Sequence, residues 1–409
     1  MDDRSALNIL ALDDEPFMLK LLARVLANLG YSSVTTCDNG RDALALLDRP
    51  EVRPNLILLD INMPGMDGLE FVRRLVERNY AGSLILISGE DERTQQAAEK
   101  LARVHNISVL GHLHKPATRE GLEELIAKWV LVAADVSRAE KKIYSADAVR
   151  AALNNGELVN YYQPKVEVAT LRVVGVETLV RWNHPQDGLV LPDQFVGVAE
   201  ANGMIDELTL MVLGEAMAQA HAWQDAGIEL QVAVNLSMDN LGSLDFLDRV
   251  AELAVRSGVP PQVMELEVTE TRLMKDLRTT LEILTRLRLK RFRLSIDDFG
   301  TGNSSLAQLR DLPFDELKID QSFVHGAAGN ARLRAMFDSS IGLAKQLGME
   351  AVAEGVEDDS DWEFVRQKGC DIAQGFHIAK PMPAAELPGW LRSWQTGHIT
   401  PGPGLQAPS

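Results

Sequence analysis

The chain has 409 residues, a length at which two domains are expected. Hydrophobic residues make up 46% of it and charged residues 24%, as in globular proteins that bury cores. The formal net charge of −18 argues against binding nucleic acid through its phosphate backbone, so an anionic substrate would need local positive charge such as metal ions. The only cysteines, Cys37 and Cys370, lie in different halves, which argues against a disulfide framework and favours a reducing, cytoplasmic location. No signal core or apolar run of membrane-spanning length is present, so no membrane association is expected.

Residues 8–130 alternate short apolar runs with amphipathic helical stretches. This alternation predicts a parallel sheet that is covered by helices on both faces. The expected strands are "NILAL", "SSVTTC", "NLILLD", "SLILIS" and "ISVLG". From 128 to 148 the pattern is continuously helical without Gly or Pro, and we expect a stiff helical linker there.

The alternation resumes with a longer period over residues 149–395. About eight strand candidates with intervening helical segments predict a (β/α)8 barrel. The first two strands, around 158–182, have no helix between them, so we expect them to be antiparallel. The tail 396–409 is rich in Gly and Pro and is expected to be disordered.

In the N-terminal half, acidic residues and one lysine follow predicted strands. Asp13 and Asp14 follow the first strand, Asp60 ends the third, and Lys115 follows the fifth. Ligands of open α/β sheets bind outside the carboxyl ends of the strands, so these side chains are expected to meet. Three gathered acids require a divalent cation, and a metal beside a free carboxylate and a lysine suits attack of that carboxylate on a phosphoryl group. Any one of these acids alone would instead be expected to cap the next helix.

Four motifs in this half resemble the response-regulator receiver domain over residues 5–127: "LDDEP", "LILLDINMPGMDGLE", "LISG" and "LHKP". The resemblance implies a flavodoxin-like, doubly wound fold and a sensor histidine kinase as phosphodonor. It implies that Asp60 accepts the phosphoryl group and binds Mg²⁺ together with Asp13 and Asp14. By the same resemblance Ser88 senses the phosphoryl group, and Lys115 pairs with it.

Two features depart from the receiver pattern. His112 occupies the position of the usual Tyr or Phe switch, and the stretch from Ser88 to Lys115 is longer than usual, so the fourth helix is expected to be shifted. Both bear on how the domain transmits its signal. His112 and His114 could also be imagined as metal ligands, but no other His or Cys stands nearby at ligand spacing, which favours an ordinary structural role.

In the C-terminal half, nearly every predicted strand ends near a polar or acidic residue. Because strand ends converge in a barrel, these side chains are expected to share one cavity, and several carboxylates there require cations. Oxygen ligands favour Mg²⁺ or Mn²⁺ over zinc, and two such ions suit phosphodiester hydrolysis. Each acid alone could equally cap the helix that follows it. The set is Glu177, Asn235, Glu267, Asp297, Asp298, Lys318, Asp320, Glu354 and Gln374.

Seven motifs in this half resemble the EAL family of cyclic di-GMP phosphodiesterases, in the family's order: "ETLVRW", "VNLS", "LEVTE", "DDFGTGNSS", "LKID", "AEGVE" and "DIAQGF". The resemblance implies two Mg²⁺ or Mn²⁺ ions, hydrolysis of cyclic di-GMP to linear pGpG, and association of EAL domains into a homo-oligomer. Thr178 replaces the alanine of the signature and leaves the glutamate in place, and Asn303 stands where the loop usually carries Tyr.

The EAL resemblance also implies a role for each residue of the site. Glu354 acts as a metal ligand or general base, Lys318 orients the attacking water, and Asp320 supports the metal site. Glu270 orders the loop and the dimer contact. The implied metal ligands are Glu177, Asn235, Glu267, Asp297 and Asp298, and the implied substrate contacts are Gln163, Arg181 and Gln374.

Two functions other than hydrolysis are known for proteins with these domains. EAL domains that lack metal ligands act as cyclic di-GMP receptors, and the complete ligand set favours an enzyme over such a receptor. Many receiver proteins regulate transcription, but no region remains for a DNA-binding module and the net charge is unfavourable. The sequence therefore favours a cytoplasmic phosphodiesterase that is regulated by phosphorylation of Asp60.

Overall fold

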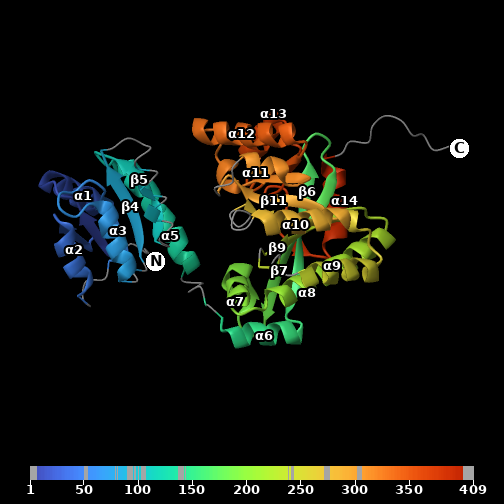
Figure 1. The fold of residues 1–409 in the computed structure, drawn as a ribbon. Helices are drawn as coiled ribbons and strands as arrows, with labels where there is room; N and C mark the ends of the chain where they lie inside the picture. The colour runs from blue at the N-terminus through green and yellow to red at the C-terminus, as the bar shows by residue number, and fades with distance from the viewer. Residues whose placement is uncertain are drawn as a thin grey trace. The chain divides into compact units, whose positions relative to one another are not determined.

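The structure is a computed structural model of the chain. It describes residues 7–49, 54–78, 80, 82–89, 95, 98–99, 101–102, 107–136, 142, 144–237, 239–240, 244–270, 277–301 and 306–398. The chain divides into two compact units, Met1–Lys141 and Lys142–Ser409 (Figure 1), which are described separately.

The N-terminal unit is built on a five-stranded parallel sheet with the strand order β2-β1-β3-β4-β5. This topology confirms the predicted flavodoxin-like fold. The strands are β1 (Ile9–Leu12), β2 (Val34–Cys37), β3 (Leu56–Asp60), β4 (Ser83–Ser88) and β5 (Ser108–His114). The helices are α1 (Pro16–Asn28), α2 (Gly40–Leu47), α3 (Gly68–Glu77) and α5 (Arg119–Val136).

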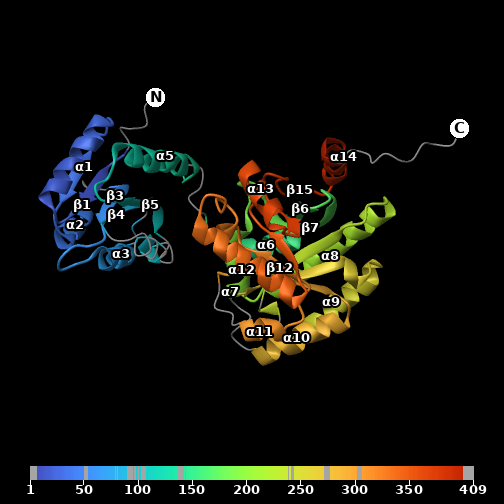
Figure 2. The same cartoon turned by 90° about the horizontal axis from the view of Figure 1, so that it is seen from above.

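Helices cover both faces of this sheet, because successive apolar residues of each strand point to opposite sides. One hydrophobic cluster joins α1 and α5 to strand residues such as Ile9 and Leu58. The other joins α2 and α3 to the strand residues that alternate with these, such as Leu10 and Leu59. Figure 2 shows α1 and α5 on one side of the sheet and α3 on the other.

The C-terminal unit is a closed barrel. Its hydrogen-bonded strands follow the order β6-β14-β13-β12-β11-β10-β9-β7, and β7 pairs back with β6. The pairing of β6 with both β7 and β14 is antiparallel, which confirms the predicted antiparallel opening pair. The barrel strands are β6 (Leu158–Glu167), β7 (Val173–His184), β9 (Gln231–Leu236), β10 (Met264–Thr269), β11 (Arg293–Phe299), β12 (Glu316–Ile319), β13 (Glu350–Ala353) and β14 (Ile372–Ala373).

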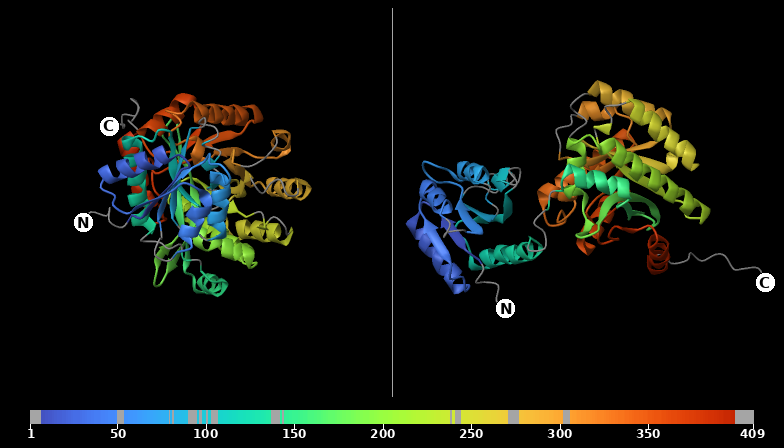
Figure 3. Two further views of the ribbon diagram at one scale, coloured as in Figure 1. Left: turned by 90° about the vertical axis from the view of Figure 1, so that its left-hand side faces the viewer. Right: turned by 90° about the horizontal axis from the view of Figure 1, so that it is seen from below.

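Helices surround the barrel (Figures 1 and 3), as expected for the (β/α)8 class. Two short strands, β8 (Gly188–Val190) and β15 (Met382–Pro383), pair with β7 and β6 outside the closed ring. The helices are α6 (Ala146–Asn155), α7 (Val196–Ala201), α8 (Ile205–Asp225), α9 (Leu244–Ser257), α10 (Leu277–Leu289), α11 (Leu306–Asp311), α12 (Ala331–Leu347), α13 (Asp359–Lys368) and α14 (Leu387–His398), with short 3-10 helices at Pro192–Gln194, Pro261–Val263 and Gln321–Phe323.

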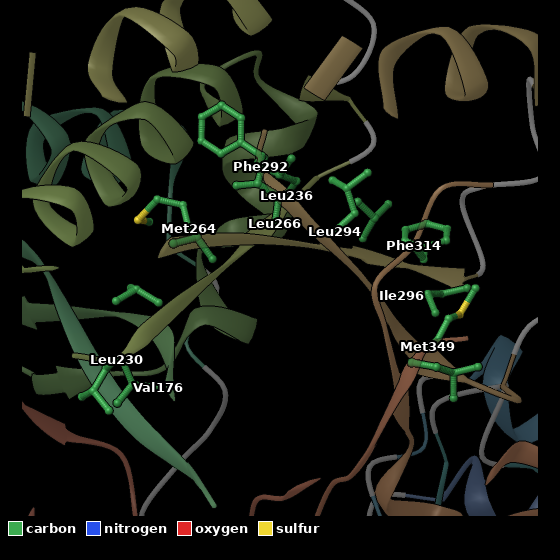
Figure 4. Close-up of a cluster of buried hydrophobic side chains, with 14 of the residues drawn as sticks. Val176, Leu230, Leu236, Met264, Leu266, Phe292, Leu294, Ile296, Phe314 and Met349 are labelled. Carbon is green, nitrogen blue, oxygen red and sulfur yellow. The ribbon is translucent and has the colours of Figure 1, made fainter. Parts of the chain in front are cut away.

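The main hydrophobic core of this unit includes alternate residues of the barrel strands together with residues of the surrounding helices. In β10 the core takes Leu266 and Val268, while Glu265 and Glu267 alternate with them. Figure 4 shows part of this core, including Leu266, Leu294 and Ile296. Because residues i and i+2 of a strand share a face, the opposite face of β10 carries its carboxylates together.

The predicted linker helix is not continuous in the part of residues 128–148 that the structure describes. Helix α5 reaches Val136, but Tyr144 and Ser145 are not helical, and a separate helix begins at Ala146. The Ser145 side chain accepts a hydrogen bond from the Ala148 amide, so Ser145 is an N-cap. At the other end, α14 continues to His398, beyond the expected boundary at 395, and the rest of the tail lies outside the described residues. Among the helices that the structure describes, none is long and apolar enough to cross a membrane.

Candidate functional site

The Lys318 ammonium group lies at the centre of a carboxylate cluster in the barrel. Its Nζ is 2.8 Å from Oε1 of Glu354, 3.0 Å from Oε2 of Glu267 and 3.1 Å from Oδ1 of Asp297. A fourth carboxylate oxygen, Oε2 of Glu177, is 3.4 Å away. The structure thus brings together five of the residues that were predicted from separate strands, and Lys318 itself is fully buried.

Two amide side chains donate hydrogen bonds to the Glu177 carboxylate, and a third amide is bonded to one of these two. Asn235 donates a hydrogen bond to Oε1 at 2.9 Å, and Gln374 donates one to Oε2 at 2.6 Å. The same Gln374 amide reaches Oε1 of Gln163 at 3.0 Å, and Gln163 donates to the Ala379 carbonyl at 3.0 Å. All four predicted positions therefore belong to one hydrogen-bonded group, and it orients Glu177 toward Lys318.

A cavity of about 250 Å³ opens beside this cluster. The residues that line it include Glu177, Asp298, Asp320, Glu354, Gln163 and Gln374. Asp298 has a φ of 55°, in the left-handed region that few residues other than glycine adopt, which marks a backbone held in place by its surroundings. The cavity is polar and acidic, as a cation site requires.

A second cavity of about 470 Å³ adjoins the first, since Leu179 lines both. Its wall is largely apolar and includes Val180, Pro192 and Ile205, and Asn235 lies at its polar side. The two cavities thus place a charged compartment and an apolar compartment on either side of Leu179. This combination suits a ligand that has both phosphates and flat rings.

The electrostatics of the cluster are dominated by burial and by mutual repulsion of the acids. Burial raises the pKa of Glu354 to about 8 despite the neighbouring Lys318, and burial together with Asp297 raises the pKa of Asp298 to about 6. The pKa of Glu267 is also raised well above its usual value by burial. For Glu177, burial also acts to raise the pKa, but Lys318 and the amide donors outweigh it and the pKa is lowered. One lysine thus leaves the cluster short of positive charge.

The donor set fits divalent cations with oxygen ligands. Carboxylate oxygens of Asp297, Asp298 and Glu354 lie within 4.8 Å of one another, close enough to share an ion. Oε1 of Glu267 is buried and has no hydrogen-bond partner, although a buried carboxylate oxygen normally has one. Carboxylates and the oxygen of one amide are ligands expected for Mg²⁺ or Mn²⁺ and not for zinc, which prefers His and Cys.

The remaining predicted residues of the barrel lie around this centre. Oε2 of Glu270 accepts a hydrogen bond of 2.7 Å from the Gly300 amide, so Glu270 anchors the loop that follows Asp298. Asp320 accepts a hydrogen bond from the Ser322 amide and caps a 3-10 helix. Arg181 shares a strand face with Glu177, and its guanidinium bonds to the Val180 carbonyl. Asn303 lies outside the described residues.

Sequence reasoning missed a second buried charged group in the barrel. It consists of Lys165, Glu265 and Glu316. Each of them lies two residues along its strand from a residue of the site around Lys318, namely Gln163, Glu267 and Lys318 itself. A period-two repeat of charged residues in "ELEV" and "ELKI" was the signal that could have found them.

The N-terminal unit contains the predicted acidic site. Lys115 Nζ is 2.8 Å from Oδ2 of Asp60 and 2.8 Å from Oδ2 of Asp13, and both aspartates are buried. Carboxylate oxygens of Asp13, Asp14 and Asp60 lie within 4.8 Å of one another, as a shared cation would require. Burial raises the pKa of Asp60 although Lys115 opposes this, and hydrogen bonds to Asp13 and Asp60 outweigh burial to raise the pKa of Lys115.

Ser88 and the two histidines lie next to this site. Ser88 ends β4, and its carbonyl accepts a hydrogen bond from the Lys115 amide at 2.9 Å. His112 Nδ1 is 2.9 Å from Oε2 of Glu99, and His114 Nδ1 is 2.7 Å from the Lys115 carbonyl. The pairing of β4 with β5 shifts by one residue between Leu84 and Ile85, so part of the extra length before Lys115 is a β-bulge.

Comparison with known families agrees with both halves. A model of the EAL domain matches residues 146–381, and a model of the response regulator receiver domain matches residues 9–127. The chain is 34% identical to cyclic di-GMP phosphodiesterase RocR of Pseudomonas aeruginosa over 380 residues, which cover 92% of this chain and 96% of RocR. It is 41% identical to cyclic di-GMP phosphodiesterase NbdA of the same organism over 265 residues, 64% of this chain but 34% of NbdA.

A solved structure gives the same result for the barrel. The chain resembles "PaMucR Phosphodiesterase, c-di-GMP complex" with a TM-score of 0.57 and 41% sequence identity, over 58% of this chain and 97% of that one. The strand order, the convergence of acids on Lys318 and the two family matches lead to one assignment: the chain belongs to the EAL domain family, as a response regulator with an N-terminal receiver domain.

Proposed function

We propose that the C-terminal domain hydrolyses cyclic di-GMP to linear pGpG with two divalent cations, Mg²⁺ or Mn²⁺. The observation that carries this proposal is the convergence of four carboxylates on Lys318, three from different strands and one directly after a fourth strand. The names of RocR and NbdA, both called cyclic di-GMP phosphodiesterases, support the choice of substrate.

Three of the ligands proposed for the cations line the acidic cavity, and the others contact Lys318 or Glu177 beside it. Cations bound there would lower the pKa of a water molecule and offset the charge on the phosphate. Asp320, at the edge of the cavity, would support the ligands through their hydration. The ligands are Glu177, Asn235, Glu267, Asp297, Asp298 and Glu354.

The protein's own groups would handle the protons. Hydrolysis adds a water oxygen to phosphorus and breaks one P–O bond to a 3′ oxygen, so one proton leaves the water and one reaches the departing oxygen. Glu354 lines the cavity and is placed to accept the proton of the water. The Lys318 ammonium group, 2.8 Å from Glu354, would orient that water through a hydrogen bond.

The substrate contacts are assigned from the shape and polarity of the two cavities. Gln163 and Gln374 lie in the acidic cavity, where their amides can meet the sugar-phosphate ring. The apolar cavity beyond Leu179 would receive a guanine base, since flat rings gain most from burial against apolar walls. Arg181 would contact a phosphate, and its guanidinium lies 6.0 Å from the centroid of the Tyr161 ring in the present state.

We propose that a sensor histidine kinase phosphorylates Asp60 and that this modification regulates the barrel. The buried Asp60 carboxylate faces Lys115 and the acids Asp13 and Asp14, which would hold Mg²⁺ beside it. A phosphoryl group on Asp60 would compete for Lys115 and for the Ser88 hydroxyl, and so draw β4 and β5 toward it.

We also propose that the chain forms a homo-oligomer through its EAL domains and acts in the cytoplasm. The support is the family resemblance together with the anchoring of the Gly300 loop by Glu270. Light scattering of the purified chain tests this proposal, because a monomer at micromolar concentration would exclude it.

The experiment that tests the enzymatic proposal is incubation of the purified full-length chain with cyclic di-GMP and either Mg²⁺ or Mn²⁺, followed by chromatography. The expected product is linear pGpG, which should be missing from a Glu177→Gln variant and present for a Glu229→Gln control, at the other end of the barrel. Binding of cyclic di-GMP without pGpG, with either metal and with or without a phosphodonor, would make the chain a receptor instead.

A further inference from the structure

A second buried charge cluster lies inside the barrel, below the carboxylates that surround Lys318. Lys165 Nζ is 2.7 Å from Oε2 of Glu265 and 2.7 Å from Oε1 of Glu316. The Ser295 hydroxyl donates to Glu316 at 2.9 Å, and Arg293 Nε lies 3.3 Å from Oε1 of Glu265. Lys165, Glu265 and Glu316 are each exposed by 3% or less.

The place of this cluster within the strands explains its relation to the site. Glu265 precedes Glu267 by two residues on β10, Glu316 precedes Lys318 by two on β12, and Lys165 follows Gln163 by two on the antiparallel β6. Side chains two residues apart point to the same face of a strand. The lower cluster is therefore the next layer of side chains inside the barrel, one step away from the cavity.

Such a layer is usually filled by Val, Ile and Leu. Burying charges costs several kcal/mol for each ion, and a buried ion pair is often no more stabilising than apolar residues of the same volume. The hydrophobic core of the barrel therefore gives no reason for a lysine and two glutamates at this depth. We therefore look for the role of these charged residues in their effect on the carboxylates around Lys318.

Glu267 connects the two layers. Its Oε2 lies 3.0 Å from Lys318 in the upper layer, and its Oε1 lies 4.0 Å from Lys165 in the lower layer. Oε1 is buried and has no hydrogen-bond partner. Glu267 thus lies between two ammonium groups, one on the side of the cavity and one beneath it.

We propose that Lys165 is a positioning residue of the phosphodiesterase: from beneath, it fixes the Glu267 carboxylate in place and offsets its charge, so that this carboxylate is prepared to bind a divalent cation. The inference rests on the proposed function. Glu265 and Glu316 in turn hold Lys165, which has no route to solvent.

The test uses the full-length chain and a binding measurement that needs no turnover. Lys165→Met removes the positive charge beneath Glu267. Lys165→Met combined with Glu316→Gln removes that charge together with one buried negative charge, so the net charge of the layer stays the same. Lys368→Met, which breaks an exposed ion pair with Asp338, serves as the matched lysine control. Calorimetry measures Mn²⁺ affinity, thermal unfolding measures stability, and chromatography measures pGpG.

The expected result separates positioning from stability. Lys165→Met should lower the unfolding temperature and weaken Mn²⁺ binding by about 10–100-fold, the usual effect of losing a residue behind a metal ligand. The double variant should recover most of the unfolding temperature, because a buried pair is removed whole, and it should keep the weakened Mn²⁺ affinity. The Lys368→Met control should change neither quantity.

Three outcomes would overturn the inference. Mn²⁺ affinity equal to that of the unmodified chain in either variant would show that Lys165 does not act on the ligands. Recovery of both affinity and stability in the double variant would make its role purely structural, and so would failure of both variants to fold. The proposed function fails separately, if the unmodified chain binds Mn²⁺ and yet yields no pGpG.

Discussion

Lys318 and Glu354 meet at the carboxyl ends of two neighbouring strands, with 2.8 Å between Nζ and Oε1. Lys318 also contacts three further carboxylates, so Glu354 receives only a share of its charge. This sharing explains why burial can raise the pKa of Glu354 to about 8 next to an ammonium group. The pair can therefore form without cations, with the Glu354 carboxyl largely protonated near neutral pH. A cation that binds Glu354 would displace this proton, because a metal ligand must be deprotonated.

Glu354→Gln should lower pGpG formation by about 10²–10⁴-fold, the usual contribution of a general acid or base. Unfolding should change little, because without metal the Glu354 carboxyl is protonated near neutral pH and the amide has the same shape. Product chromatography and a thermal melt check both parts. Glu350→Gln, at the start of the same strand, is the control. A variant that keeps a tenth of the activity would remove Glu354 from the mechanism.

The free energy of unfolding of the metal-free protein should fall as the pH rises from about 4.5 to about 8. The folded-state pKa of Glu354 is raised from 4.5 to about 8, so its stabilisation is complete below 4.5 and lost as the pH rises through 8. Asp298, raised from 3.8 to about 6, acts in the same direction.

Urea unfolding in EDTA across this pH range measures the slope, and saturating Mg²⁺ should reduce it because the cations replace the protons. Glu354→Gln should flatten the slope in EDTA. A slope of the opposite sign, or one that this variant leaves unchanged, would contradict the assignment.

Asp60→Asn should abolish the rate response to a small phosphodonor such as acetyl phosphate and keep basal pGpG formation within about twofold. The reason is that the amide cannot accept a phosphoryl group, whereas the barrel carries its own ligands. Asp48→Asn, which alters an exposed pair with Arg78, is the control. Paired assays of phosphorylation and turnover measure both quantities, and a full response in the Asp60→Asn variant would refute control through Asp60.

His112→Tyr should change the ratio of phosphorylated to basal activity and leave the basal activity unaffected. The Nδ1 atom of the His112 ring lies 2.9 Å from Oε2 of Glu99, so this contact joins β5 to a helical residue. Coupling of about 0.5–2 kcal/mol corresponds to a change of about two- to thirtyfold. Glu99→Gln breaks the same contact and should act in the same direction, in contrast to Glu77→Gln on α3. Opposite effects of the first two variants would show that the pair does not transmit the signal.

Both folds follow largely from hydrophobic periodicity, because most of the sheet and barrel strands contain a short run rich in apolar residues, whereas the short strands β8 and β15 were not predicted. The upper carboxylate cluster followed from the positions of acids at strand ends, which a barrel brings together. The linker was different: the stretch before Ser145 has no Gly or Pro, and a serine side chain that accepts a hydrogen bond from a backbone amide marks the start of a separate helix. A single N-cap residue is a weak sequence signal when the residues around it continue a long helical pattern.

The lower charge cluster was also missed, for a different physical reason. Glu265 is the second residue of β10 and Glu316 the first of β12, where a charged residue is expected to face solvent. Only closure of the barrel turns these positions inward, and only the antiparallel β6 supplies Lys165 to them. Contacts between residues 100 and 151 positions apart cannot be read from local patterns.

The position of β6 also decides when the enzyme can first work. This strand is the first of the barrel and pairs with β14, about two hundred residues later, so the ring stays open until the end of the chain is available. The bond from Gln374 to Gln163 spans the same seam. A chain still being synthesised, or one cut short before Ile372, therefore lacks an assembled cleft whatever the state of its receiver.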